Sequence, residues 1–195
     1  MSRLSKDAIV TAAIAILDTE GETALTFRAL AAHLKTGAGA IYWHVADKDA
    51  LLSAATDALI DQTLRAAPAT VQVVALAIFD AVEARPWLGT QLSREPWQPA
   101  AGRIFEAVGA ALPPLNETDA FHAASALMSL ILGAAAQHAA ARRLPSGTQR
   151  PAFLATVAQA WSTGAFTHRI APQLRDHDDR AQFLAGIELV LKGLN

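Results

Sequence analysis

Cysteine is absent from the 195 residues of this chain. The chain can therefore form no disulfide, no thiolate metal site and no cysteine nucleophile. The alternation of polar and apolar residues that is typical of a strand is missing as well, whereas alanine is abundant. Alanine favours helices over strands. The composition predicts an all-α protein, and the length allows one or two domains.

The net charge is also small. Sixteen lysines and arginines stand against 18 aspartates and glutamates, which gives a formal charge of −2. The overall basic character of many nucleic-acid-binding proteins is thus missing. Positive charge is instead local, because Arg3, Lys6, Arg28, Lys35 and Lys48 lie in the first quarter of the chain. Any affinity for phosphate should be moderate, and two copies of the chain would strengthen it.

One long segment lacks charge altogether. Residues 120–141 contain no Asp, Glu, Lys or Arg, and they are long enough to span a bilayer. His122, Ser125 and Gln137 interrupt the segment, and its many alanines contribute little to insertion. A buried packing helix is the better interpretation. The N-terminus also lacks the apolar core of a signal peptide, so we expect a cytoplasmic protein without a membrane partner.

Helix signals divide the chain into three parts. Ser5 is expected to cap a first helix that ends at Gly21, within a small domain over residues 1–46. A connecting helix over 47–66, capped by Asp47, leads to a larger helical domain over 67–195. There we expect helices over 71–84, 100–112, 118–142 and 151–170, and a last helix that is capped by the run 176–179 and ends at 192. We also expect a short helix within 87–99, a break at Pro172 and a mobile loop over 144–150.

A helix followed by a glycine-bearing turn stands out in the small domain. Thr26 can cap the helix, because its hydroxyl can accept a hydrogen bond from a free N–H of the first turn. Phe27, Leu30 and Leu34 then recur at helical spacing, so one face of the helix is apolar. The break that follows contains Gly37, which tolerates the positive φ that ends a helix.

A second short helix is expected over 38–45. Ile41 and Val45 share its inner face, so the aromatic tripeptide 42–44 cannot lie wholly inside. A helix, a turn and a helix with a polar, aromatic outer face together form the pattern of a helix-turn-helix.

These residues resemble the N-terminal domain of the TetR family of transcriptional regulators, and the YWHV block at 42–45 resembles its tetracycline repressor branch. The resemblance is carried by MSRL at 1–4, Leu25-Thr26, Arg28, Leu30-Ala31, the YWHV block, Lys48 and Ala50-Leu51-Leu52. In the family the outer face of the third helix enters the major groove of double-stranded operator DNA. Carried over by position, this implies DNA contacts from Thr26, Arg28, Ala38, Ala40, Tyr42, Trp43, His44 and Lys48.

The implied contacts differ in what they can recognise. Arg28 can present a two-pronged donor to guanine, whereas Lys48 and the tripeptide 42–44 can donate to phosphates. The start of the second helix departs from the tetracycline repressor, because Ala38 and Ala40 are too small to hydrogen-bond a base. At most they touch a thymine methyl. Base preference should therefore depend on Arg28 and on DNA shape.

In the family the larger domain holds a small inducer. Three positions that serve tetracycline and its magnesium in the tetracycline repressor hold Leu64, Trp87 and Gln137 here. None of these is a good magnesium ligand. The resemblance then implies no metal and no cofactor, but a largely apolar inducer. We expect its pocket to be lined by Leu64, Trp87, Thr90, Trp97, Phe105, Phe121, Gln137 and Phe166, although each aromatic taken singly is as well explained by ordinary core packing.

Two later helices carry surfaces suited to pairing. A stripe of small residues at four-residue spacing runs along the uncharged helix, and an apolar stripe runs along the last helix. Paired with their symmetry mates, the two helices predict a four-helix homodimer core. The predicted interface residues are Ser125, Ser129, Gly133, Phe183, Ile187, Val190 and Leu194. The alternative is that both helices are internal core.

The combined prediction is a ligand-responsive transcriptional regulator, a repressor by resemblance, that binds operator DNA as a homodimer and is released by its inducer. An enzyme is one alternative, because His168 and the run 176–179 could suggest acid–base or metal chemistry. Their spacing matches no ligand pattern, and aspartate at a helix start is what capping predicts. A helical adaptor that does not read DNA also stays open, since the net charge is near zero.

Overall fold

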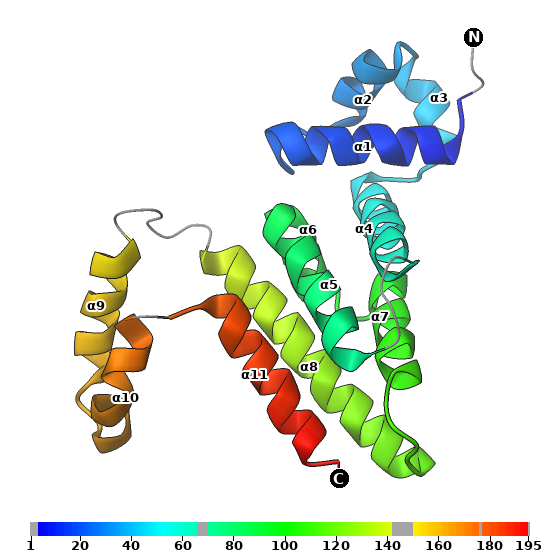
Figure 1. The fold of residues 1–195 in the computed structure, drawn as a ribbon. Coiled ribbons are helices and arrows are strands. Elements are labelled where there is room, and N and C mark those ends of the chain that lie inside the picture. The colour runs from blue at the N-terminus through cyan, green and yellow to red at the C-terminus, as the bar shows by residue number, and fades with distance from the viewer. Residues whose placement is uncertain (1–3, 66–69, 142–149, 176, 195) are drawn as a thin grey trace.

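The computed structural model describes residues 4–65, 70–141, 150–175 and 177–194, and every regular element in those ranges is a helix (Figure 1). The predicted all-α class is confirmed. A small group at one end, which we call the head, consists of α1 Lys6–Glu20, α2 Phe27–Leu34 and α3 Ala38–Tyr42. From it α4 Lys48–Arg65 leads into the body, made of α5 Val71–Ala84, α6 Pro86–Arg94, α7 Pro99–Ala110, α8 Glu117–Ala141 and α11 Asp179–Lys192. The division into domains at residues 46 and 66 stays a prediction.

Three predicted helix caps are present. The Ser5 hydroxyl accepts from the Ala8 N–H at 3.2 Å, and the Thr26 hydroxyl accepts from the Ala29 N–H at 3.1 Å. Asp47 begins α4 in the same way, because its Oδ1 accepts from the backbone of Ala50 at 2.7 Å. Each cap satisfies an N–H that has no partner inside its own helix.

The turn between α2 and α3 differs from the prediction. Lys35, and not Gly37, takes the positive φ of 52° that ends α2, and its N–H reaches the carbonyls of Ala31 and Ala32. Gly37 is extended, with φ −84° and ψ 143°. α3 is also shorter than expected, because it ends at Tyr42. After Tyr42 the helical hydrogen-bond pattern ends, and the N–H groups of His44 and Val45 both donate to the carbonyl of Ile41.

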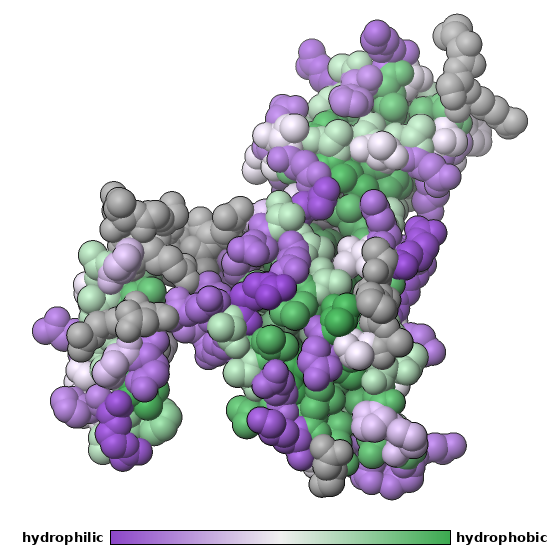
Figure 2. Space-filling view, viewed as in Figure 1, coloured by the Kyte–Doolittle hydropathy of each residue, from purple (hydrophilic) through white to green (hydrophobic). Residues whose placement is uncertain are grey.

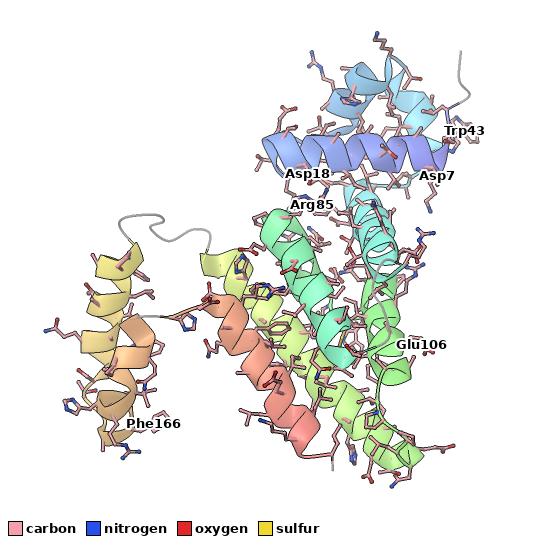
Figure 3. All side chains as sticks on the ribbon, viewed as in Figure 1. Asp7, Asp18, Trp43, Arg85, Glu106 and Phe166 are labelled. Atoms are coloured by element: carbon pink, nitrogen blue, oxygen red, sulfur yellow. The ribbon has the colours of Figure 1, made fainter. Side chains whose placement is uncertain are left out.

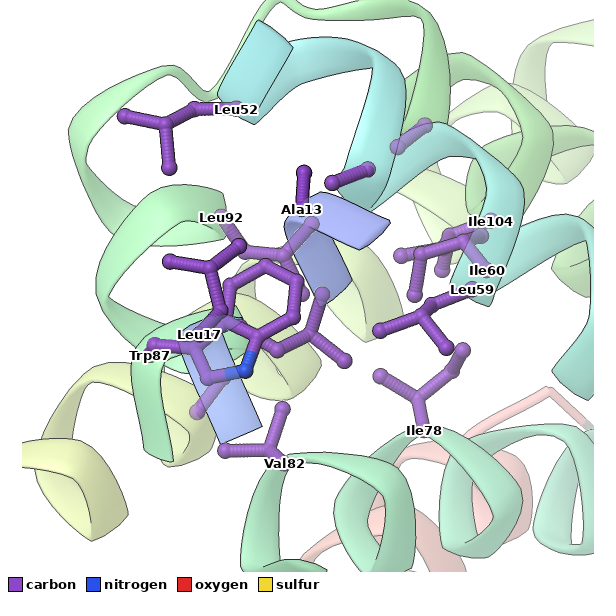
Figure 4. Close-up of a cluster of buried hydrophobic side chains, with 14 of the residues drawn as sticks. Ala13, Leu17, Leu52, Leu59, Ile60, Ile78, Val82, Trp87, Leu92 and Ile104 are labelled. Carbon is purple, nitrogen blue, oxygen red and sulfur yellow. The ribbon is translucent and has the colours of Figure 1, made fainter. Parts of the chain in front are cut away.

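One apolar core runs through head and body (Figure 4). Leu17 of α1, Leu52 and Ile60 of α4, and Ile78 of α5 belong to the same buried cluster. Trp87 of α6 lies among them. The helix α4 thus packs on the head over its first half and on the body over its second half, so a tilt of α4 would disturb both.

The uncharged segment forms most of α8. By length and composition α8 is the one helix in the described chain that could cross a membrane, over Glu117–His138. It packs against α5, α6, α7 and α11, and Leu127 and Ile131 on it are buried. The prediction of a packing helix agrees with this arrangement.

The helix expected over 151–170 is two helices, α9 Arg150–Trp161 and α10 Ala165–Arg175. The break lies around Gly164, whose carbonyl accepts from the Thr167 hydroxyl at 3.1 Å. The predicted break at Pro172 is wrong, because proline lies inside α10, where it removes only one backbone donor. α9 and α10 pack on each other and stand away from α8 and α11 (Figure 1). Residues 144–149 of the predicted mobile loop lie outside the described residues.

Replacing Lys35 by glycine should stabilise the chain. A side chain in the left-handed region costs about 1–2 kcal/mol, which glycine avoids, although glycine gains freedom when unfolded. We therefore expect Lys35→Gly to raise the free energy of unfolding by about 0.5–1 kcal/mol in urea titrations. Lys35→Ala keeps the Cβ and should give no comparable gain. Equal effects of both changes would contradict a strained Lys35.

Candidate nucleic-acid interface and ligand groove

The head presents the predicted tripeptide to solvent. Ile41 and Val45 are buried and fix the position of the segment between them. Trp43 is 91% exposed and Tyr42 56% exposed, and His44 is exposed as well. The Tyr42 ring stacks on Phe27 of α2, with centroids 4.2 Å apart and planes within 3°. An aromatic, hydrogen-bonding corner therefore stands out from the head, and the Trp43 label marks it in Figure 3.

The other predicted DNA contacts vary in what they offer. Arg28 is exposed on α2, where its guanidinium is free to reach outward from the head. Thr26 is exposed too, although its hydroxyl is used as a helix cap. Ala38 and Ala40 are half-buried, and Ala38 packs on the core. α3 thus has almost no side chain with which to read bases.

Lys48 has a partner within the chain. Its Nζ donates to the backbone carbonyl of Glu22 at 2.7 Å, and the side chain is half-buried. This bond ties the start of α4 to the loop that follows α1. An ammonium has three donors, so a phosphate contact from Lys48 stays a prediction, but its first role is to hold the head together.

Two carboxylates of the head are bound by α6. The Asp18 carboxylate accepts from Arg85 Nε at 3.0 Å (Figure 3). It also accepts from the Trp87 indole N–H at 2.8 Å. The Glu22 carboxylate accepts from both terminal nitrogens of Arg94, at 3.0 and 3.4 Å. We call these five residues the latch. It joins the head to both ends of α6.

The latch perturbs the titration of Glu22 and Arg94. The hydrogen bond from Arg94 lowers the pKa of the Glu22 carboxyl, against the smaller opposing effect of burial. The same bond raises the pKa of Arg94. A carboxylate that gains donors and a positive neighbour favours its charged form, so the bonded state is the ionised one.

A second set of ion pairs joins α4 to α7. The Arg103 guanidinium binds Asp57 and lies 3.4 Å from an oxygen of Asp61, which also pairs with Arg65 at 2.9 Å. Together with the latch, these pairs connect α1 and α4 to the body at separate points. Movement of the head relative to α6 must therefore break or rearrange the latch, and movement of α4 relative to α7 must break or rearrange the Arg103 pairs.

The residues predicted to line the inducer pocket do not all meet in one place. Trp97 is 96% exposed in the loop after α6, and Phe166 is exposed on α10. Phe121, exposed on α8, lies near Phe105, with ring centroids 6.3 Å apart, and Leu64 and Phe105 pack against the core. The remaining two predicted residues on α6 are also used elsewhere, since the Trp87 indole binds Asp18 and the Thr90 hydroxyl donates to the Pro86 carbonyl. Of the eight, Gln137 lines a cavity.

That cavity is a groove of about 560 Å³ between α8 and α11. Phe79 and Phe183 lie along it, with ring centroids 5.2 Å apart. Its other lining residues are Ser129, Leu130, Gly133, Ala134, Gln137, His138, His177, Asp179, Gln182, Ala185, Gly186 and Leu189. Figure 2 shows apolar surface over the face that carries α8 and α11. The small residues Gly133 and Ala134 on α8 and Ala185 and Gly186 on α11 are the feature of the sequence that could have indicated this groove.

The predicted dimer surface needs a correction on α11. Phe183 and Ile187 are buried within the chain, at 5% and 0% exposure, so their side chains serve mainly the core of one copy. Val190 and Leu194 are half-buried. The large apolar side chain that α11 exposes is Leu189, which is 70% exposed and lies two positions after Ile187 and one before Val190 of the predicted stripe. On α8 the predicted stripe lies outward, with Ser129 exposed and Ser125 and Gly133 half-buried.

Replacing Glu22 by glutamine should weaken the chain in a pH-dependent way. The pKa of Glu22 is lower in the folded state than its ordinary 4.5, so its ionised form stabilises the fold above that pH. We expect Glu22→Gln to cost about 1 kcal/mol or less at pH 7, because the pair is partly solvated. The difference should vanish as the pH falls through the lowered pKa. Exposed Glu20 supplies the control Glu20→Gln, and an equal loss from both variants would contradict the latch.

Comparison with known proteins agrees with this geometry. Residues 9–55 match the family described as bacterial regulatory proteins, tetR family. The tetracycline repressor protein class E of Escherichia coli is 40% identical over 60 residues, and an HTH-type transcriptional regulator of Saccharopolyspora erythraea is 42% identical over 59 residues. These two matches span 28% and 25% of the two proteins and about 30% of this chain. The family match, over residues 9–55, covers the head and the start of α4.

Solved structures match over the whole chain. A transcriptional regulator of Streptomyces coelicolor, described as a TetR, is 48% identical, with 98% of both chains covered and a TM-score of 0.82. ActR of the same organism, solved in complex with actinorhodin, is 23% identical with a TM-score of 0.78 and covers 99% of this chain and 97% of its own, which shows a common fold. At 48% identity over 98% of both chains, the first of these proteins is a relative of this chain. The chain belongs to the TetR family of transcriptional regulators.

Proposed function

We propose that this regulator is a cytoplasmic repressor that binds operator DNA as a homodimer and is released by a small, largely apolar inducer. The observation that carries the DNA-binding part is the exposed corner at Tyr42, Trp43 and His44, held between buried Ile41 and Val45. A tripeptide with this composition would bury its rings if it had only a packing role. Its exposure favours contact with a partner.

The corner suits the backbone of DNA better than its bases. The tyrosine hydroxyl, the indole N–H and the imidazole can each donate to a phosphate oxygen and fix the register of the head. Arg28 is the residue with a donor fork that matches the major-groove edge of guanine. Because α3 offers only small side chains, recognition by shape and deformability of the DNA would supply the remaining specificity.

A homodimer would supply the affinity that a near-neutral chain lacks. Two heads placed about 34 Å apart would read two half-sites one helical turn apart. The exposed stripe on α8, together with Leu189 on α11, gives the surface for pairing. Small side chains on α8 would let a partner helix approach closely.

Release would follow from linkage. A ligand that binds better to a shape in which the heads are wrongly spaced weakens DNA binding by its differential affinity. A coupling of about 1–3 kcal/mol corresponds to roughly 5–150-fold weaker operator binding. The change of shape would be transmitted by α4 and α6. The latch joins α6 to the head, and the Arg103 pairs join α4 to α7 of the body. Relatives solved with actinorhodin and with minocycline support a small-molecule inducer.

The main alternative is a helical adaptor that does not read DNA. The net charge of −2 and the absence of base-reading side chains on α3 favour it. Duplexes from the region upstream of the gene separate the two functions. A repressor binds them with an affinity that falls steeply as salt rises, whereas an adaptor does not bind them.

Substitutions at the head should separate base reading from backbone contact. Arg28→Ala should cost about 1–3 kcal/mol on the preferred duplex and relax base preference. Trp43→Ala should weaken binding to all duplexes alike, by about 1 kcal/mol. Fluorescence anisotropy with matched and mismatched duplexes measures both effects. Trp97→Ala removes an equally exposed indole outside the head and serves as the control. Unchanged base preference in Arg28→Ala would contradict the assigned readout.

Replacing Leu189 by lysine should dissociate the homodimer. The change places a charge in the centre of the proposed apolar contact, where it would lose its hydration. Light scattering coupled to size exclusion should give the mass of two chains for the unsubstituted protein and of one chain for Leu189→Lys. Gln62→Lys adds the same charge at an exposed position of α4 and should remain dimeric. A single-chain mass for the unsubstituted protein would rule out the homodimer.

A further inference from the structure

Two helices of this chain are not covered by the body. α9 and α10 pack on each other, and neither makes an extensive contact with any other helix of the described ranges (Figure 1). We call residues 150–175 the arm. No described side chain of the arm belongs to the apolar core that runs through head and body. The arm is therefore an αα-hairpin beside the body and not a part of its core.

The arm has almost no core of its own. The side chains that it buries, in the part that the structure describes, are those of Ala158 and Ala171, 2% and 8% exposed. Trp161 and Phe166 are 57% and 62% exposed, and the half-buried apolar side chains are Phe153, Leu154, Val157 and Ile170. Helices of 12 and 11 residues are marginal in water without packing partners. A further surface must therefore cover the aromatic side chains of the arm.

The two exposed rings lie at the tip of the arm. Trp161 is the last residue of α9, and Phe166 lies in the first turn of α10 (Figure 3). The hydroxyl of Thr167 lies within hydrogen-bonding reach of the backbone carbonyls of Trp161 and Gly164, which holds the turn between the helices. The Arg169 guanidinium lies 5.9 Å from the centre of the Phe166 ring. A tip that is both aromatic and positively charged suits an apolar surface with acidic residues around it.

Charge favours a second copy of this chain as that surface. The arm contains three arginines and no aspartate or glutamate. The rest of the chain therefore has 13 lysines and arginines against 18 acidic residues, a formal charge of −5. The arm of one copy is attracted to the acidic remainder of another, whereas two arms repel each other.

The place of the arm indicates the same partner. In the sequence the arm follows α8 and precedes α11, the two helices that carry the proposed pairing surface. Figure 1 shows it on the side of α8 and α11 that faces away from α4 and α7. A second copy placed on the pairing surface brings its body beside this arm, and the symmetry of the pair returns the same contact. The arm therefore continues the surface that contains Ser129 and Leu189.

We propose that the arm of each copy packs on the body of the other copy, with Trp161 and Phe166 as its anchors. The inference rests on the proposed homodimer and extends its contact beyond α8 and α11. An aromatic side chain buries about 150–250 Å² when it is covered. Two anchors from each copy thus supply a substantial part of the roughly 800 Å² per partner of a stable interface. The reciprocal contacts also fix the angle between the two bodies, on which the spacing of the two heads depends.

The tryptophan at the tip reports the contact directly. The difference between the emission of the unsubstituted chain and that of Trp161→Phe isolates Trp161 among the four tryptophans. Where two copies pair, this emission should be shielded from acrylamide, and dilution to single chains should expose it. Leu189→Lys, which separates the copies, should show the exposed form at every concentration. An arm that packs on its own body would stay shielded under all these conditions, which would contradict the proposal.

The strength of pairing gives a second measurement. Trp161→Gln should raise the dissociation constant of the dimer about 30-fold, the loss typical of a buried aromatic anchor. Sedimentation equilibrium measures this constant. Trp97→Gln removes a 96% exposed indole outside the arm and should leave the constant unchanged. If Trp161→Gln does not fold, the emission of Trp161 decides alone.

The arm and the homodimer fail in different ways. Stable dimers in which Trp161 stays exposed would overturn the arm contact and leave the homodimer standing. Single chains at all concentrations would overturn both. Shielding of Trp161 that requires added duplex DNA or vesicles of anionic lipid would overturn the arm contact, because the cover would then be another class of partner.

Discussion

The carboxylates of Asp18 and Glu22 determine how the head meets the body. Each is held by α6, one by Arg85 and the Trp87 indole, the other by Arg94. The shared apolar core below α1 sets the distance between head and body but is not directional. Hydrogen bonds to charged groups are directional, so the latch selects one orientation out of those the core would allow.

A continuous set of contacts runs from the groove to the head. α8 forms one wall of the groove and packs along α6. α6 carries two of the five latch residues, Trp87 and Arg94, and Arg85 directly precedes it. In the proposed repressor, a ligand that displaces α8 would act on the head by this route as well as through α4. The ion pairs that join the head and α4 to the body are partly exposed. Such pairs contribute little stability each, which suits elements that must exchange partners.

The sequence-based predictions succeeded where the partner of a side chain lies within a few residues of it in the sequence. Ser5, Thr26 and Asp47 cap their helices because short polar side chains reach free N–H groups of the first turn, whatever the rest of the chain does. They were incomplete where one side chain can serve several purposes. The role of Trp87 in a ligand pocket stays a prediction, but the Asp18 carboxylate, 69 positions earlier, accepts a hydrogen bond from its indole, and no local pattern encodes that pair. The same holds for Lys35, where the fold imposed a left-handed residue two positions before the glycine that could have supplied it.

The sequence by itself determined the helical class and the caps at Ser5, Thr26 and Asp47. It also determined the outward position of Tyr42 and Trp43, because helical periodicity leaves no room for them beside Ile41 and Val45. Tertiary structure alone decided which of the remaining aromatics meet, and it placed Phe183 inside the chain and Leu189 outside. Adjacent positions on one helix differ by about 100° in direction, so only the neighbouring helices decide which face is inner. The groove between α8 and α11 belongs to this second class, since it arises where helices far apart in sequence come together.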